Sequence, residues 1–201
     1  MKRLSNFLII SGVLLFITVL AIKGFTYYKQ QQLIQSFQNV AFDELNQQEE
    51  TKKNPLGHTG QAASQLAIGM LRMDQIDLQV PIVEGTDVED LRYAVGHFPE
   101  SGQLGKKNHN FAIAGHRSYT FGEYFNRLDE VKENDTFFID TAEGEFEYRI
   151  YDKQIVKPDA VSVLQPVKGK SVVTLVTCHP AHSSKERLIV FAEKIEKKKE
   201  K

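Results

Sequence analysis

Cysteine is nearly absent from this sequence: the only one among 201 residues is Cys178. A single cysteine excludes an intramolecular disulfide framework and any zinc module that needs several thiolates. The formal net charge is −1, so no excess of positive charge points to nucleic acid or to an acidic membrane surface. P-loop, GxGxxG and EF-hand patterns are missing as well, which excludes the commonest nucleotide- and calcium-binding modules.

The sequence does have a long apolar run near its start. Residues Leu4–Ile22 carry no charge, and a helix of this length nearly spans a hydrocarbon core of ~30 Å. We predict an uncleaved transmembrane anchor within residues 1–28. A secretory signal peptide cleaved after Val19-Leu20-Ala21 is the alternative. Lys2 and Arg3 precede the run, so the positive-inside bias predicts a cytoplasmic N-terminus and an extracellular body in a single-pass cell-membrane protein.

The rest of the chain divides by composition. Residues 29–63 are rich in Gln and Glu and read as an extracellular spacer. Apolar residues at helical spacing from Leu33 to Leu45 predict one amphipathic helix there, and a solvated stalk is the alternative. We place the compact domain at residues 64–196. Residues 197–201 form a charged tail, most simply a solvated end.

Short strands dominate the compact domain. A capping-box pattern at Thr86–Glu89 predicts a short helix to about Val95, and Pro81 is interpreted as marking an edge strand. A helical turn is expected over Phe121–Leu128. Seven or eight strands with short helical pieces predict a mainly β fold, a closed or nearly closed barrel. The expected strands are Leu66–Met73, Leu78–Val83, Asn110–Gly115, Thr136–Asp140, Glu145–Val156, Val172–Cys178 and Arg187–Ile195.

The lone cysteine ends one of these strands. Val172–Cys178 is rich in β-branched residues, and alternation puts Thr174, Val176 and Cys178 on one face. His179-Pro180 then stops the strand, because proline cannot donate to a ladder. The thiol therefore lies where a rigid strand meets a loop, which suits a nucleophile. The alternative is a free cysteine that serves as a small core residue.

Two other residues are candidates to act with the thiol. His116 follows an apolar strand that ends in the small residues Ala-Gly, which let other groups approach. Arg187 opens the last strand, and a hairpin that pairs residues 178 and 187 puts both side chains on one face. An imidazole or guanidinium beside a thiol favours the thiolate. Ordinary surface or core roles are the alternative for both residues.

A zinc site is the alternative to this catalytic interpretation. Cys178-His179-x-x-His182 supplies two kinds of zinc ligand, but His179 precedes a proline and no fourth ligand is evident. We therefore expect no cofactor. Calcium dependence stays open, since Glu84, Asp87 and Glu89 are acidic residues of a kind common on protein surfaces.

The residues around the thiol resemble those of the sortases of Gram-positive bacteria. Thr174-Leu175-Val176-Thr177-Cys178 matches the TLxTC pattern of that family, with Ala114-Gly115-His116 upstream and Arg187 downstream. Leu78–Gly85, Val95–Phe98 and Gly115–Leu128 are also similar. The resemblance implies an eight-stranded β-barrel in which Cys178 is the nucleophile, His116 the general acid/base and Arg187 the transition-state stabiliser. By the same resemblance, Ala114, Val176 and Thr177 bind substrate.

The resemblance also implies an activity. Sortases cut a C-terminal LPxTG-type signal between Thr and Gly and transfer the acyl group to an amine of the cell-wall precursor. The expected partners are surface proteins with such signals, a lipid II-type amine and the membrane, with no nucleic acid. Cys-His-Pro after the strand, together with Gly115–Ser118 leading to Phe125–Leu128, favours class D over class A. The lack of a second apolar span argues against the pilin-polymerising class.

Two other function classes remain open at this point. One is a membrane-anchored module that binds sorting signals without cleaving them. The other is a cysteine hydrolase that releases its acyl group to water. The sequence does not distinguish them from a transpeptidase.

Overall fold

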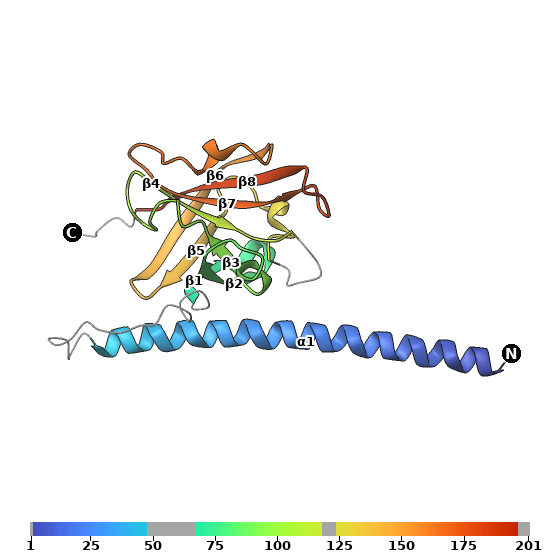
Figure 1. Ribbon diagram of the computed structural model, residues 1–201. Coiled ribbons are helices and arrows are strands. Elements are labelled where there is room, and N and C mark those ends of the chain that lie inside the picture. The colour runs from blue at the N-terminus through green and yellow to red at the C-terminus, as the bar shows by residue number, and fades with distance from the viewer. Residues whose placement is uncertain (1, 48–66, 118–123, 197–201) are drawn as a thin grey trace.

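A computed structural model describes residues 2–47, 67–117 and 124–196, and it contains a closed barrel of eight strands. The predicted eight-stranded barrel is therefore confirmed. Figure 1 shows the barrel beside one long helix, α1 (Lys2–Gln47), with β7 and β8 on the side away from it. The strands are β1 (Ala67–Met73), β2 (Leu78–Glu84), β3 (Val95–His97), β4 (His109–Ala114), β5 (Thr136–Thr141), β6 (Gly144–Val156), β7 (Ser171–His179) and β8 (Glu186–Lys194).

The strands close in the order β1-β2-β3-β4-β7-β8-β6-β5, and β5 returns to pair with β1. Two neighbouring pairs are parallel, β2–β3 and β4–β7, and the others are antiparallel. Strand β2 thus has a partner on both sides, and the interpretation of Pro81 as an edge marker is wrong. Proline is tolerated because the ladder to β3 covers only Ile82–Glu84, beyond the ring that lacks an N–H.

The segment before β3 differs most from the sequence prediction. The expected helix from Thr86 to about Val95 shrinks to the 3-10 turn η3 (Asp90–Arg92), and the short strand β3 follows it unpredicted. Close backbone packing explains why the chain extends here: a Cβ on Gly96 would lie 2.0 Å from the carbonyl oxygen of Gly85. Of the expected turn over Phe121–Leu128, residues 121–123 lie outside the described part. The 3-10 turn η4 comes slightly later, at Leu128–Glu130.

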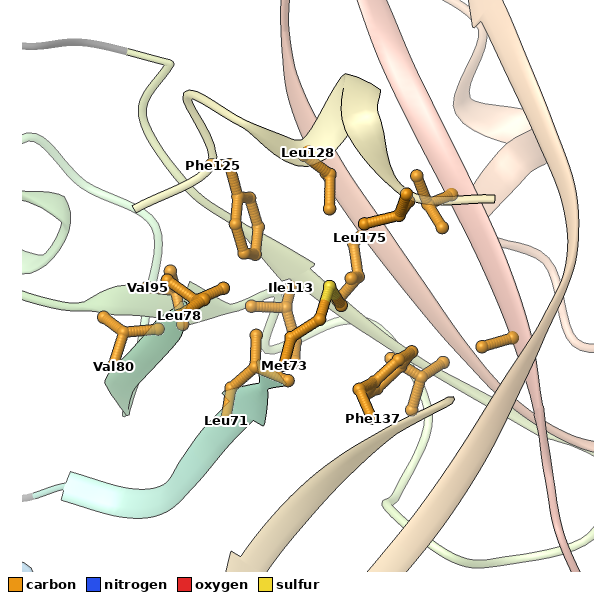
Figure 2. Packing of buried hydrophobic residues seen from close by; sticks show 14 of the residues in the cluster. Leu71, Met73, Leu78, Val80, Val95, Ile113, Phe125, Leu128, Phe137 and Leu175 are labelled. Carbon is orange, nitrogen blue, oxygen red and sulfur yellow. The ribbon is translucent and has the colours of Figure 1, made fainter. Parts of the chain in front are cut away.

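The barrel interior is filled by one apolar cluster. Alternating residues of β6, Tyr148 and Ile150, are buried in it, as the alternation with Glu147 and Arg149 predicts. Figure 2 shows side chains from several strands converging, with Met73 and Phe137 close to the centre. Other members include Leu71, Ile113, Phe125, Leu128, Val173, Leu175, Leu188 and Val190. Strands β4, β7 and β8, which carry the candidate residues, are thus fixed from inside by packing.

The apolar run at the start forms one helix long and apolar enough to cross a membrane, Asn6–Gln35. The predicted N-terminal apolar helix is therefore present, and it is a candidate membrane span. Helix α1 continues without a break through the proposed boundary at residue 28 and reaches Gln47, so the spacer is helical that far. The helix contacts the barrel at β1 and β2, where Thr26 is buried and the ring of Phe25 lies edge-on to Tyr93, 6.5 Å between centroids. The domain start at residue 64 and the tail 197–201 lie outside the described residues.

Candidate active site

The candidate nucleophile lies at the outer face of the barrel, near the end of β7. Val173, Leu175 and Thr177 of this strand are buried and face inward. Their neighbours alternate to the other face, so Cys178 points outward, and its free thiol is half-buried. The predicted faces of this strand are therefore those in the structure.

Strand β8 brings Arg187 to the same position from one side. The antiparallel register makes Arg187 the direct partner of Cys178, so the two side chains share the outer face. The Nη1 group of Arg187 donates to the carbonyl oxygens of Ser184 and Glu186, both at 3.0 Å. These bonds hold the guanidinium over the β7–β8 connection. Among the described residues its Nε and Nη2 groups have no acceptor.

Strand β4 brings His116 to the thiol from the other side. Ala114 pairs with Val176 in the parallel β4–β7 ladder, and the N–H of Gly115 continues that ladder by donating to the Val176 carbonyl at 3.0 Å. The same register places His116 opposite Cys178 on the outer face. His116 is half-buried, and desolvation lowers the pKa of its imidazole below the ordinary value of 6.5. Its neutral form is thereby favoured.

The predicted substrate-binding residues fall on two faces. Ala114 and Val176 are register partners, half-buried on the outer face next to the thiol, where they form an apolar floor. Thr177 is buried on the inner face, and its hydroxyl donates to the carbonyl oxygen of Gly115 at 2.7 Å. Its side chain therefore joins β7 to β4. The role of all three in binding substrate stays a prediction.

The outer face of β4 and β7 is covered at the end that lies away from Cys178. Asn110 of β4 accepts a hydrogen bond from the Thr174 hydroxyl at 2.7 Å. Its amide nitrogen donates to the carbonyls of Val163 and Gln165, in and just after the 3-10 turn η5 (Val161–Leu164). Thr174 is fully buried, whereas Val176 and Cys178 further along β7 are not. The exposed floor thus begins near Val176 and ends at the thiol.

A cavity of about 610 Å³ lies beside the connection between β7 and β8, next to the start of β8. Val156 pairs with Arg187 across β6–β8, and the chain after Val156 forms one wall. The cavity is lined by Lys157, Pro158, Asp159, Pro180, Lys185 and Glu186. Its charged groups balance, two cations against two carboxylates.

Sequence reasoning missed a group of buried polar residues behind the thiol. The guanidinium of Arg117 contacts His179 and forms an ion pair with Asp129, 2.8 Å between Nη2 and Oδ2. Asn126 is also buried, and within the described part of the chain its Oδ1 has no hydrogen-bond partner. The only hint in the sequence is that Arg117 follows the candidate base His116 and so alternates to the inner face.

The zinc alternative does not fit this geometry. Cys178 and His179 point to opposite faces of β7, and His179 Nδ1 accepts a bond from Arg117. Glu84, one of the acidic residues weighed for calcium, binds the imidazole of His97 through both carboxylate oxygens at 3.0 Å. No three His, Cys, Asp or Glu side chains converge within residues 67–117 and 124–196. Calcium dependence remains untested.

The strand registers therefore bring a thiol, an imidazole and a guanidinium to one end of the same outer face. A thiolate attacks acyl carbons, an imidazole moves protons, and a fixed cation stabilises an oxyanion. The arrangement is suited to acyl transfer through a thioester, with an apolar strand surface leading to the sulfur.

Comparisons with known proteins find relatives of this chain. A family model described as Sortase domain matches residues 71–195, from β1 to just past the end of β8. Sortase D of Bacillus subtilis (strain 168) is 31% identical over 140 residues, which is 68% of this chain and 66% of that protein. The chain thus spans just under two thirds of that relative's length.

Solved structures are similar as well. A Clostridium perfringens Sortase D5 transpeptidase has a TM-score of 0.64 at 26% identity, covering 85% of this chain and 98% of that one. Sortase E1 from Streptomyces coelicolor, with a tripeptide in its active site, has a TM-score of 0.61 at 32% identity. That likeness covers 65% of this chain and 88% of the other.

Proposed function

The chain belongs to the sortase family, and from that premise we propose that it is a membrane-anchored cysteine transpeptidase that acts in cell-wall anchoring. Its substrates are surface proteins with a C-terminal LPxTG-like signal, cut between Thr and Gly. One observation carries the proposal: the registers of β4, β7 and β8 bring His116, Cys178 and Arg187 to one outer face at one end of the barrel. Each residue has the chemistry that one role requires.

The first half-reaction forms a thioester. Cys178 gives its proton to His116, and the resulting thiolate attacks the threonine carbonyl carbon while the carbonyl electron pair moves to oxygen. Arg187 is a permanent cation with a planar fork, suited to donate to that oxyanion. His116 gives a proton to the departing glycine amine as the C–N bond breaks. The products are a thioester on Cys178 and the released C-terminal peptide.

The second half-reaction transfers the acyl group. A cell-wall precursor amine of the lipid II type attacks the thioester carbonyl, and His116 takes the proton that the amine loses. The thiolate leaves, and a new amide bond links the surface protein to the precursor. The apolar floor of Ala114 and Val176 is the proposed seat for the Leu-Pro part of the signal, with Thr177 behind it. Neither half-reaction as written needs a cofactor.

The anchor sets where this occurs. We place the N-terminus in the cytoplasm and the barrel outside the cell, so that the protein meets substrates after their export. Lys2 and Arg3 before the span support this orientation. Protease added to protoplasts should then digest the barrel and spare a small membrane fragment. An intact protein that begins near Ile22 would show that the apolar run is a cleaved signal peptide.

Among sortases, class D is favoured over class A.

One experiment tests the activity against its alternatives. The full chain in detergent is incubated with a library of LPxTx peptides, with and without added amines, and the products are identified by mass spectrometry. A transpeptidase yields an amide adduct with the amine. A cysteine hydrolase yields only the free acid whether or not amine is present. A binding module retains peptide without cleaving it, and either of the last two outcomes contradicts the proposal.

A further inference from the structure

We propose that Arg117 is a positioning residue, which holds His116 opposite Cys178 by tying the ends of β4 and β7 together behind them. The reaction that this alignment serves is the proposed acyl transfer, so the inference rests on that function. The link itself is a property of the folded chain. It is therefore testable without any sorting signal.

The Arg117 guanidinium is buried, with its side chain only 6% exposed, and each of its nitrogens has a different partner. Nε donates to the carbonyl oxygen of Asn126 at 3.4 Å, and Nη1 donates to Nδ1 of His179 at 2.9 Å. Nη2 pairs with the carboxylate of Asp129 at 2.8 Å. One side chain thus joins three segments: the chain after β4, the chain around η4, and the end of β7.

The strand register explains why the bonds of Arg117 affect His116 and Cys178 on the outer face. On the inner face, the Thr177 hydroxyl donates to the carbonyl of Gly115, one step before the outer pair of residues 116 and 178. The bond from Arg117 to His179 lies one step after that pair. His116 and Cys178 therefore lie between two inner-face links. Regular ladder hydrogen bonding stops at Gly115, so the second link replaces it where the strands end.

Only arginine suits this position. A buried cation is costly unless its donors are paired, and here all three nitrogens are bonded. Lysine has one nitrogen and cannot reach three partners in a plane. The bond to His179 also fixes the tautomer of that ring: Nδ1 is the acceptor, so the ring proton lies on Nε2. The end of β7 is thus fixed next to the nucleophile.

Loss of the link should misalign the imidazole and the sulfur. A displacement of ~1 Å at a reacting pair can cost on the order of 10² in rate. We expect Arg117→Gln to lower the rate of acylation ~10- to 100-fold, with KM changed less than about 3-fold, because the outer floor is intact. Arg117→Lys should restore little. His179→Ala should also lower the rate, and its effect should not add to that of Arg117→Gln.

The matched control is Arg72→Gln in the full chain. Arg72 is also a paired arginine, bonded to Asp140 at 2.6 Å and Glu145 at 3.0 Å, but it lies on β1, away from β4 and β7. Rates are normalised to the folded fraction measured by urea unfolding. Arg72→Gln should acylate within about 3-fold of wild type, and its effect should add to that of His179→Ala. If both Arg117 variants fail to fold, His179→Ala alone tests the same link, because it removes the acceptor of the Arg117 bond.

A second readout needs no sorting signal. Iodoacetamide alkylation of Cys178 is measured against pH for wild type, His116→Ala, Arg117→Gln, His179→Ala and Arg72→Gln. The wild type and Arg72→Gln should show an inflection from His116 that is lost in His116→Ala. Arg117→Gln and His179→Ala should lose it too. Two results would overturn the inference. One is a wild-type alkylation profile in both Arg117→Gln and His179→Ala. The other is a wild-type protein whose profile is the same as that of His116→Ala. If wild type fails to acylate with any peptide but the profiles behave as expected, the proposed function fails and the positioning role stands.

Discussion

Arg187 is the register partner of Cys178 in the β7–β8 pair, and its guanidinium is held by the carbonyls of Ser184 and Glu186. Among the described residues no carboxylate lies within ion-pair distance of it, so the cation is not neutralised by a protein anion. A fixed cation of this kind is ready for charge that develops on a substrate oxygen. The β7–β8 hairpin holds this guanidinium through backbone groups alone, namely the strand register and two carbonyl oxygens.

Arg187→Ala should therefore lower kcat/KM for a sorting peptide by on the order of 10²–10³. Arg187→Lys should not restore full activity, because an ammonium keeps the charge and loses the planar fork. The loss should appear in the pre-steady-state acylation step, before any amine is involved, so extra amine should not rescue it. Stability should stay within about 0.5 kcal/mol of wild type. Near-normal acylation by Arg187→Ala would remove this residue from the site.

Gly115 is the second test, because it sets the approach of the segment that carries the base. A Cβ at this position would lie 2.5 Å from the ring of Phe125, which is fully buried and cannot move away. The N–H of Phe125 also donates to the His116 carbonyl at 3.1 Å. Gly115→Ala should cost about 1–3 kcal/mol in the free energy of unfolding and displace His116.

The control for that substitution is Gly24→Ala, where a Cβ would meet nothing within 4 Å. Urea unfolding and peptide cleavage are measured for both variants. Gly24→Ala should be neutral in both assays. A Gly115→Ala variant with wild-type stability and activity would show that the contact with Phe125 does not constrain the site.

The third prediction concerns pH. Burial lowers the pKa of His116 below 6.5, so between its folded and unfolded pKa values the unfolded chain binds more protons. This contribution to stability is complete above 6.5 and is lost as the pH falls through the folded value. The wild type should therefore lose more stability than His116→Gln on going from pH 7.5 to pH 5. Urea unfolding of both proteins at the two pH values checks it, and equal losses would contradict it.

The sequence predicted the parts of the site that follow from strand alternation. The faces of β7, the pairing of residues 178 and 187, and the close approach at Gly115 all follow from period-two patterns and a small residue, and the structure has them. The order of strands around the barrel does not follow from alternation. It depends on the parallel pairs β2–β3 and β4–β7, which join segments distant in the chain.

The missed features depend on contacts that no local pattern encodes. Strand β3 has three residues and is held in place by its neighbours and by packing against Gly85, whereas the sequence predicted only a helix that ends near Val95. Arg117 alternates to the inner face after His116, but the local sequence does not show what it contacts. It is buried because Asp129 and His179, 12 and 62 residues away in the chain, supply its partners. Such long-range polar links appear only once the barrel is closed.

The account depends most on a thioester at Cys178. The full chain is mixed with an LPxTG peptide in the absence of amine, quenched in acid within seconds, and analysed by intact mass and peptide mapping. The wild type should carry the mass of the peptide up to threonine on Cys178, and hydroxylamine should remove it. Cys178→Ala should fold normally, carry no adduct and release no product. Peptide cleavage by Cys178→Ala, or turnover by the wild type without an adduct on this sulfur, would contradict the account.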